Sequence, residues 1–301
     1  MRKSVICVIL MACVLAAPSC KKEETTTTTP SLSGLVVETA IPYLAVGSSL
    51  TLRLSTKNIY TSDNSNPGDI GLSWQVNEEK RDTLDKGVME FTYTVKEVGS
   101  YTVTCYAFAN GYYSSSATTT FECINPETAL IGVNTANTVV ISGKEWTAHN
   151  LYDTESGSHY RKAEVVAPLF GKLYTWEEAS TACPAGWHLP TAEEWDVLGT
   201  DAYSLMAPAQ FIGKDMWASA LGQSITNVNK FNAIPVGYLD TTASVDQFCR
   251  FGEYAAFWTA TPSANNTDWA QTRYFIYNNA TVQKGEGDKS SLALSVRCVK
   301  D

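Results

Sequence analysis

The stretch 171–198 reads GKLYTWEEASTACPAGWHLPTAEEWDVL and predicts two short helices joined by a rigid bend. In each helix a threonine precedes a glutamate by three residues, Thr175 with Glu178 and then Thr191 with Glu194. This spacing is a capping box, in which the hydroxyl accepts a first-turn N–H and the glutamate reaches back to the threonine N–H. A proline and a glycine separate the two helices. The stretch therefore predicts a folded nucleus, with no evident catalytic group.

The segments on either side of this nucleus predict strands. Residues 139–146, VVISGKEW, predict a strand, a turn at Ser142-Gly143 and a second strand. Residues 152–168 are polar and contain glycine, so they are expected to form a surface loop. The last strand is expected over 292–299, where alternation places Cys298 on the inward face.

These residues carry a resemblance to a known family. GKLYTWEEA and ACPAGWHLPTAEEWDVL, together with VVISGKEWTAHNL (139–151) and SVRCVKD (295–301), resemble the Fibrobacter succinogenes major paralogous domain over residues 134–301. That family is similar to the C-type-lectin-like and formylglycine-generating-enzyme-like folds. The resemblance implies a C-terminal α+β C-type-lectin-like domain with two short helices and a disulfide. It implies no activity, because the family has no established biochemical function.

The resemblance also implies how two of the cysteines pair. In lectin-like folds a helix cysteine bonds to one on the terminal strand, which carries over to Cys183 and Cys298. Cys105 and Cys123 fall on neighbouring predicted strands, both on the core side. The sequence leaves open whether these two form a second disulfide or remain free. Cys249 is then the odd cysteine, without an assigned role.

Residues 32–124 predict an N-terminal all-β sandwich. Strand-like runs recur at sandwich spacing, at 34–39, 49–56, 70–76, 88–95, 100–108 and 115–124. Trp74 stands where a strand-C tryptophan would, and Tyr101 resembles the tyrosine of a tyrosine corner. The segment resembles an Ig-like or polycystic-kidney-disease-type module, which is expected to act as a spacer. Residues 125–133 are expected to be the linker to the second domain.

The first residues predict export and anchoring. Residues 1–19 form a signal peptide with a basic start and an apolar run. Cys20 follows small residues and is the expected lipidation site, with an ordinary signal-peptidase cut as the alternative. Residues 20–31 form a threonine-rich tether, and its KKEE at 21–24 is similar to the signal that sends Bacteroidetes lipoproteins to the outer face of the outer membrane. The expected location is therefore the outer membrane, lipid-anchored and surface-exposed.

Composition and motifs narrow the function. A net charge of −9 argues against nucleic acid as a partner, since nucleic-acid binding needs a basic surface. His149, His159 and His188 are scattered, with no helical pair that would hold a metal, and no cofactor motif is present. Formylglycine-generating enzymes use a pair of copper-binding cysteines before their terminal strand, but residues 257–297 contain no cysteine. The calcium-lectin triplets Glu-Pro-Asn and Gln-Pro-Asp are also missing.

These observations predict a non-catalytic binding or adhesion module on a lipid-anchored surface protein. Its ligand would be a glycan or an extracellular protein, and the sequence does not point to the binding residues. Two alternatives remain, a structural component of the envelope without a soluble ligand and an enzyme on a formylglycine-generating-enzyme-like fold. An exposed aromatic groove would favour the binding module.

Overall fold

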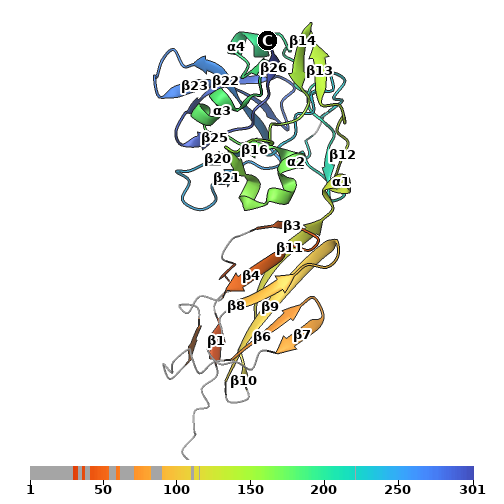
Figure 1. Ribbon diagram of the computed structural model, residues 1–301, viewed down its shortest axis with the longest axis vertical. Coiled ribbons are helices and arrows are strands. Elements are labelled where there is room, and N and C mark those ends of the chain that lie inside the picture. The colour runs from red at the N-terminus through yellow and green to blue at the C-terminus, as the bar shows by residue number, and fades with distance from the viewer. Residues whose placement is uncertain are drawn as a thin grey trace, which may run out of the picture.

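The computed structural model describes residues 30–32, 36–37, 41–53, 59–61, 71–82, 90–109, 112–114, 116–220 and 222–301. The chain is mostly β, with a slender N-terminal part below a larger C-terminal part (Figure 1). The expected signal peptide at 1–19, the lipidation candidate Cys20 and the tether up to residue 29 lie outside the described residues. Within the described part, no helix combines the length and the apolar character needed to cross a bilayer.

The N-terminal part is built from two facing sheets and one strand pair. The larger sheet has the order β3 (Tyr43–Ala45), β11 (Ala117–Ile124), β9 (Gly99–Ala109), β6 (Gly71–Val76) and β7 (Glu79–Asp82), with β10 (Tyr112–Tyr113) also paired to β9. The smaller sheet has the order β2 (Val36–Val37), β4 (Ser49–Arg53) and β8 (Glu90–Thr94). The remaining pair is β1 (Pro30–Leu32) with β5 (Ile59–Thr61). All six expected runs contain a strand.

One apolar core lies between the two sheets. Trp74 on β6 is fully buried and stacks on Phe91 of β8, with ring centroids 5.2 Å apart. The hydroxyl of Tyr101 donates to the carbonyl of Glu97 at 2.8 Å, four residues upstream. Two facing sheets, a buried tryptophan and a tyrosine corner are the features of an Ig-like sandwich.

The second disulfide that the sequence left open, Cys105–Cys123, does not form. Both cysteines are buried in this core as free thiols. In the β9–β11 ladder Cys105 pairs with Ala117, whereas Cys123 pairs with Gly99 at the other end. Six residues of strand separate the two positions, roughly 20 Å at the rise of a β-strand. A disulfide needs α-carbons within about 7 Å.

The expected linker at 125–133 is folded against the C-terminal part. It contains α1 (Pro126–Ala129), capped by Asn125, and β12 (Leu130–Ile131). β12 pairs with β18 (Gln210–Phe211), which in turn pairs with β19 (Lys214–Asp215). Two residues are too short a run for a periodicity to reveal, and their partner strand lies 80 residues away.

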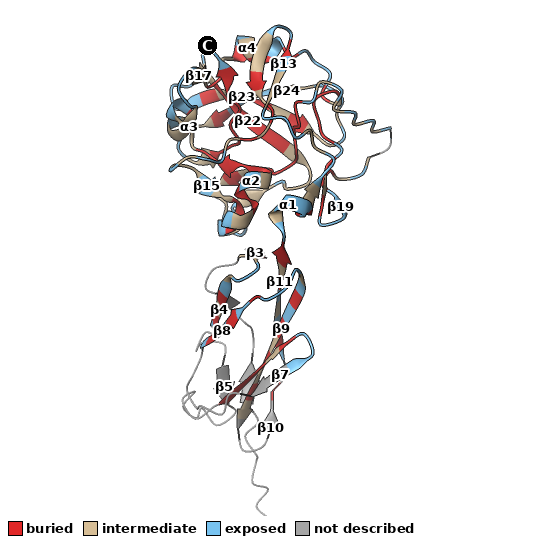
Figure 2. Cartoon of the chain, turned by 45° about the vertical axis from the view of Figure 1, so that its right-hand side comes forward, coloured by how far each residue is buried: buried red, intermediate tan, exposed pale blue. Residues whose placement is uncertain are grey.

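The C-terminal part surrounds three adjoining apolar cores with short sheets and short helices (Figure 2). The helical elements are the 3-10 turns η3 (Tyr160–Lys162) and η4 (Glu164–Val166) and the helices α2 (Ala167–Phe170), α3 (Trp176–Ala182) and α4 (Ala192–Asp196). One sheet has the order β13 (Thr138–Ile141), β14 (Lys144–Thr147), β26 (Val299–Lys300) and β17 (Trp187–His188). A second pairs β15 (Ser158–His159) with β16 (Lys172–Leu173). The others are β21 (Phe248–Cys249), β20 (Tyr238–Asp240), β25 (Leu292–Ala293), and β22 (Tyr254–Pro262), β23 (Trp269–Ile276), β24 (Gln283–Asp288).

The nucleus at 171–198 folds as its sequence predicts. Thr175 caps α3 and Thr191 caps α4, and both capping boxes are complete. Cys183 at the end of α3 is bonded to Cys298 beside β26, as the resemblance implied. Residues 152–168, expected to be a surface loop, instead contain η3, η4 and the buried Tyr160.

A buried arginine ties the motif segments together. Arg297 is fully buried, and its guanidinium donates to Asn150 Oδ1 at 2.8 Å and to the carbonyls of Thr147, Phe231 and Asn232. No carboxylate is among these acceptors. The guanidinium also lies 4.4 Å from the ring centroid of Phe231. Burial lowers the pKa of Arg297 to about 9, so the side chain is still charged at neutral pH. Arg297 thus fixes the last segment, whose Leu294 reaches the surface hollow described next.

Candidate functional site

A groove lies on one face of the β22–β23–β24 sheet, beside β20 and residues 292–294. Residues directly opposite each other in antiparallel strands share a face. The register pairs Ala256 with Tyr274 and Thr272 with Gly285, and Gly287 follows on the same face. Small residues therefore form the floor of this groove, which we call the tyrosine groove.

Two glycines let side chains at the tyrosine groove pack closely against β24. A β-carbon on Gly285 would lie 2.9 Å from a ring carbon of Tyr274, and one on Gly287 would lie 3.1 Å from Trp258 and Leu292. A larger residue at either position would displace a wall or fill the floor. Glycine weakens a strand interior and often marks a close approach by a ligand or another backbone. Both glycines are therefore explained by close packing, because the ring of Tyr274 lies against Gly285, and Trp258 and Leu292 lie against the buried Gly287.

Tyrosines form the walls. The rings of Tyr254 and Tyr274 are parallel within 9°, with centroids 5.8 Å apart. Tyr238 on β20 completes the set, and all three side chains are half-buried. No hydrogen-bond partner for their hydroxyls is found among the residues that the structure describes. Burial raises the pKa of Tyr238, so its hydroxyl keeps its proton and can donate as well as accept.

The charged residues in the lining are acidic. Asp240 and Glu286 line the groove, and no lysine or arginine does. Asp240 Oδ1 already accepts from the N–H and the hydroxyl of Thr242, at 2.9 and 2.6 Å. The hollow has a volume of about 330 Å³ and is lined by Tyr238, Asp240, Tyr254, Ala256, Thr272, Tyr274, Glu286, Gly287, Leu292 and Leu294.

A second hollow, of about 320 Å³, lies near Arg297. His149, Asn150, Tyr152 and Asp153 are among its lining residues. Burial lowers the pKa of His149, and the nearby positive charge of Arg297 lowers it further. This histidine is therefore neutral at physiological pH, and Asn150 is already bonded to Arg297.

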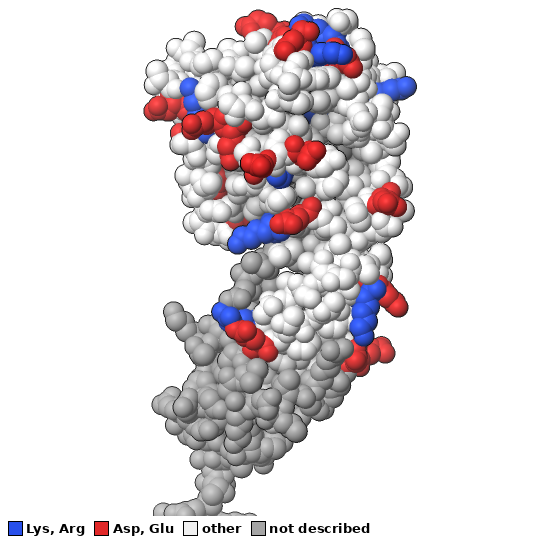
Figure 3. Space-filling model, viewed as in Figure 1, with Lys and Arg blue, Asp and Glu red and all other residues white. Residues whose placement is uncertain are grey.

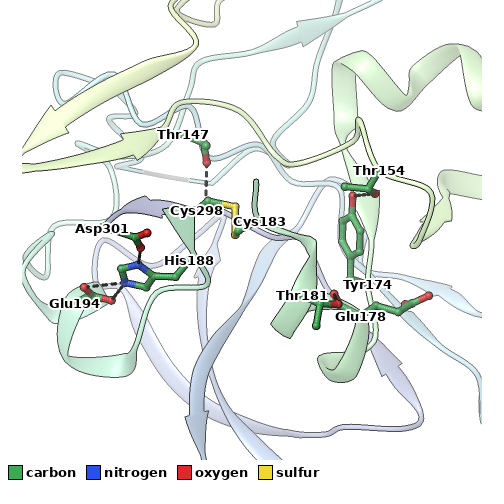
Figure 4. The surroundings of a disulfide bond; sticks show 10 residues. All are labelled: Thr147, Thr154, Tyr174, Glu178, Thr181, Cys183, His188, Glu194, Cys298 and Asp301. Atoms are coloured by element: carbon green, nitrogen blue, oxygen red, sulfur yellow. Dashed lines mark hydrogen bonds and ion pairs between the residues drawn. A yellow bond between two sulfur atoms is a disulfide. The ribbon is translucent and has the colours of Figure 1, made fainter. Parts of the chain in front are cut away.

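His188, the third histidine of the C-terminal part, lies near the disulfide between Cys183 and Cys298 (Figure 4). His188 Nδ1 lies 2.6 Å from Asp301 Oδ1, and its Nε2 lies 3.0 Å from Glu194 Oε2. Both ring nitrogens can donate to carboxylates only when the imidazole is protonated. Burial alone would lower the pKa of His188, but these hydrogen bonds outweigh it and raise the pKa. Among the described residues, no three His, Cys, Asp or Glu side chains gather as a metal site would require.

The sequence did not point to the tyrosines of the groove. Tyr254, Tyr274 and Tyr238 lie on three different strands, and only the fold brings them together. One local signal exists, because KGEGD at 284–288 places glycine at alternate positions of a strand. Residues at alternate positions of a strand lie on the same face, so the two glycines leave one face of this strand without side chains. The disulfide between Cys183 and Cys298 does not line the groove and instead links the end of α3 to the segment beside β26.

By its fold and groove, the protein is a β-rich module with an aromatic hollow, preceded by an Ig-like sandwich. The family model described as "Fibrobacter succinogenes major domain" matches residues 131–300, and the chain belongs to this family. The match begins within β12, so it includes part of the segment that the sequence assigned to a linker. No curated protein matches the chain.

Solved structures show only distant likenesses. The Clostridium perfringens spore cortex lytic enzyme SleM is 13% identical over 32% of this chain and 28% of its own, with a TM-score of 0.23. A PKD domain of an M14-like peptidase from Thermoplasmatales archaeon SCGC AB-540-F20 is 16% identical, over 32% of this chain and 94% of its own, with a TM-score of 0.22. The Yersinia pseudotuberculosis adhesin InvE is 11% identical over 90% of this chain and 71% of its own, with a TM-score of 0.28. Similarity at this level does not define a shared fold.

Proposed function

We propose that this protein is a lipid-anchored surface protein whose C-terminal part is a non-catalytic recognition module, with the tyrosine groove as its binding site. The observation that carries the proposal is the groove itself. Three tyrosines, Tyr238, Tyr254 and Tyr274, line one hollow together with small residues of the sheet. Ligand sites are concave, largely aromatic or apolar, and contain a few polar groups that orient the ligand.

The chemistry of the groove favours binding over catalysis. An acid–base mechanism needs a positioned proton donor or acceptor within reach of the reacting atom. Asp240 is held in its own turn by Thr242. His188, which contacts the carboxylates of Asp301 and Glu194, lies near α4 and β26 and is absent from the groove lining.

The remaining parts of the chain fit a display role. We propose a lectin-like C-terminal domain, carried by the Ig-like spacer at 32–124 and the tether at 20–31. The face of the molecule in Figure 3 shows acidic and basic side chains intermixed over the described residues, which does not favour adsorption to a polyanion. The lipid would be attached at Cys20, in the outer membrane with the globular part outward.

The anchor is tested in cells. We expect radiolabelled palmitate to enter the wild-type protein and not Cys20→Ser, while Cys249→Ser labels normally. We also expect protease added to intact cells to degrade the globular part. Equal labelling of Cys20→Ser would overturn the anchor, and protection in intact cells would overturn the outward orientation.

The binding role is tested with residues 21–301 on arrays of glycans and extracellular proteins. The key variant is Tyr274→Ala, which removes a groove wall. Its matched control is Trp269→Ala, an exposed aromatic on the same strand outside the groove lining. We expect saturable binding that Tyr274→Ala weakens more than tenfold and Trp269→Ala leaves unchanged. Absence of binding across both arrays would favour the alternative, a structural envelope component.

A further inference from the structure

We infer that the ligand of the tyrosine groove is an uncharged saccharide, held by the tyrosine rings and their hydroxyls. This inference rests on the proposed function and adds the class of ligand. It is carried by the charge of the lining, by the arrangement of the rings and by the kinds of hydrogen-bonding groups in the lining.

The charge of the lining disfavours an anion. The charged lining residues are Asp240 and Glu286, and the nearest arginine, Arg250, is already engaged. Arg250 donates to Glu253 at 2.9 Å and lies 5.6 Å from the ring centroid of Tyr254. A sialic acid, a uronic acid, a sulfated sugar or a phosphate would therefore meet the carboxylate of Asp240, while the nearby guanidinium of Arg250 is already paired with Glu253. Like charges brought together on binding oppose it and suppress that partner.

The ring arrangement disfavours an organic cation. A quaternary ammonium group is held over the exposed faces of aromatic rings that surround it. Tyr254 and Tyr274 are stacked with centroids 5.8 Å apart, so neither a headgroup nor a sugar ring can enter between them, and a ligand can contact only their outer faces and edges. Arg250 already supplies a cation to Tyr254. The groove therefore presents a strip of rings along its wall and lacks the form of a cage.

A saccharide fits what remains. A sugar ring has apolar C–H faces and a rim of hydroxyls that both donate and accept. The groove offers apolar ring surface beside the hydroxyls of Tyr238, Tyr254 and Tyr274, with a threonine in the floor and a carboxylate at Asp240. A tyrosine combines an apolar body with a polar end, which suits a ligand of this mixed kind. The hollow of about 330 Å³ is at the small end of ligand sites, so it suits a short stretch of a longer chain.

The test measures affinity for residues 21–301 by calorimetry and affinity electrophoresis. The neutral probes are laminarin, mannan, galactan and xylan, each with and without EDTA. The competing probes are polygalacturonate, hyaluronan, choline and a mixed peptide library. The variants are Tyr254→Phe, Tyr274→Phe and Tyr274→Ala. The control is Tyr152→Phe, which removes a hydroxyl from an exposed tyrosine in the other hollow.

We expect at least one neutral probe to bind, with EDTA having no effect. Loss of one hydrogen-bonding hydroxyl is expected to weaken binding about fivefold for each Tyr→Phe change. Tyr274→Ala should weaken it more than tenfold, and Tyr152→Phe should match the wild type. Circular dichroism and melting of each variant exclude unfolding as the cause.

The remaining outcomes separate this inference from the proposed function. Binding of polygalacturonate, choline or a peptide that Tyr274→Ala abolishes would keep the recognition role and overturn the uncharged saccharide. Neutral-glycan binding that every groove variant retains would overturn the site. If no probe of any class binds, the inference and the recognition role fall together.

Discussion

Arg297 shows how much of this fold depends on one side chain. A guanidinium carries five N–H donors in a rigid plane, and here they are shared among carbonyls and an amide oxygen from two segments, 147–150 and 231–232. A lysine would bring a similar charge but cannot satisfy acceptors that lie in several directions. The carbonyls that a lysine left unpaired would be buried, and each unsatisfied carbonyl lowers the stability of the fold by about 1–3 kcal/mol.

We therefore expect Arg297→Lys to lower the free energy of unfolding by about 3–5 kcal/mol, as for two or three buried carbonyls left unpaired. Urea denaturation followed by tryptophan fluorescence measures this. Lys300→Met is the control, because Lys300 pairs with Glu145 at the surface and should matter by less than about 1 kcal/mol. A loss below about 1 kcal/mol for Arg297→Lys would show that the network is dispensable.

Arg297 also marks a limit of prediction at this scale. Alternation along 292–299 placed Cys298 inward, which is confirmed, and so implied that Arg297 faces outward. The structure buries both, because the core cluster with Tyr174, Ala179 and Leu189 covers the Cys298 side, and the segment at 231–232 covers the Arg297 side. Alternation of apolar and polar residues is visible in a sequence only where one face of the strand is exposed to solvent.

His188 makes the stability of the molecule depend on pH. Its pKa is raised in the folded protein, so the folded state binds the proton more tightly than the unfolded state. The stabilisation is complete below the unfolded pKa of 6.5 and is lost as the pH rises through the folded value. His149 and His159, whose pKa values are lowered, act in the opposite direction and at lower pH, because each destabilises the folded state as the pH falls from 6.5 through its folded pKa.

The difference between the wild type and His188→Asn isolates this contribution. At pH 5.5 the wild type should be more stable by about 0.2–1 kcal/mol, the range for exposed ion pairs. By pH 8.5 the difference should have disappeared. Thermal melting across that range measures it, and a gap that widens with pH would contradict a proton-dependent bridge to Glu194 and Asp301.

At the scale of elements, local signals predicted the helices and the longer strands, and long-range pairing decided the rest. The Thr-x-x-Glu spacing identified both capped helices, because a capping box lies within four residues. The turn at Ser142 and Gly143 was also predicted, and both residues have positive φ as a two-residue hairpin turn demands. Strands of two residues, such as β12 and β18, have no period and depend on partners far along the chain.

The disulfide secures two of these elements, α3 and the last strand. Cys183 and Cys298 are separated by 115 residues, so the bond closes a long loop in the unfolded chain. In the chain-entropy model this stabilises by about 4–5 kcal/mol. We expect the double variant Cys183→Ser/Cys298→Ser to lose about that much in urea denaturation. Cys249→Ser is the matched control, and an equal loss there would remove the special role of the bridge.

At the scale of the whole molecule, an aromatic contact joins the sandwich to the C-terminal part. Tyr43 on β3 meets the rings of Phe170 and Phe211 edge-on, at 6.3 and 5.0 Å between centroids. Burial raises the pKa of Tyr43 to about 12. Ile41 packs against the cores of both parts. The sequence could not reveal this joint, because the residues that meet come from segments more than 100 positions apart.

Removing the ring should uncouple the two parts. We expect Tyr43→Ala to cost about 3 kcal/mol, toward the lower end for aromatic truncation. Calorimetry should then resolve two transitions where the wild type melts in one. Val46→Ala is the control, since Val46 is 52% exposed beside the same strand. A single, unshifted transition for Tyr43→Ala would mean that the two parts are coupled elsewhere.

The pairing of β3 with β11 has a mechanical consequence. These strands run parallel, with Tyr43 opposite Glu122 and Ala45 opposite Ile124, and β11 leads directly into the C-terminal part. If the N-terminal side is fixed and a bound ligand is pulled, the force enters the pair at opposite ends. Their backbone hydrogen bonds are then loaded together in shear, and none can open before the others. Stretching single molecules end to end should therefore show a high rupture force. Such resistance would suit the proposed recognition role when fluid flow pulls on a bound ligand.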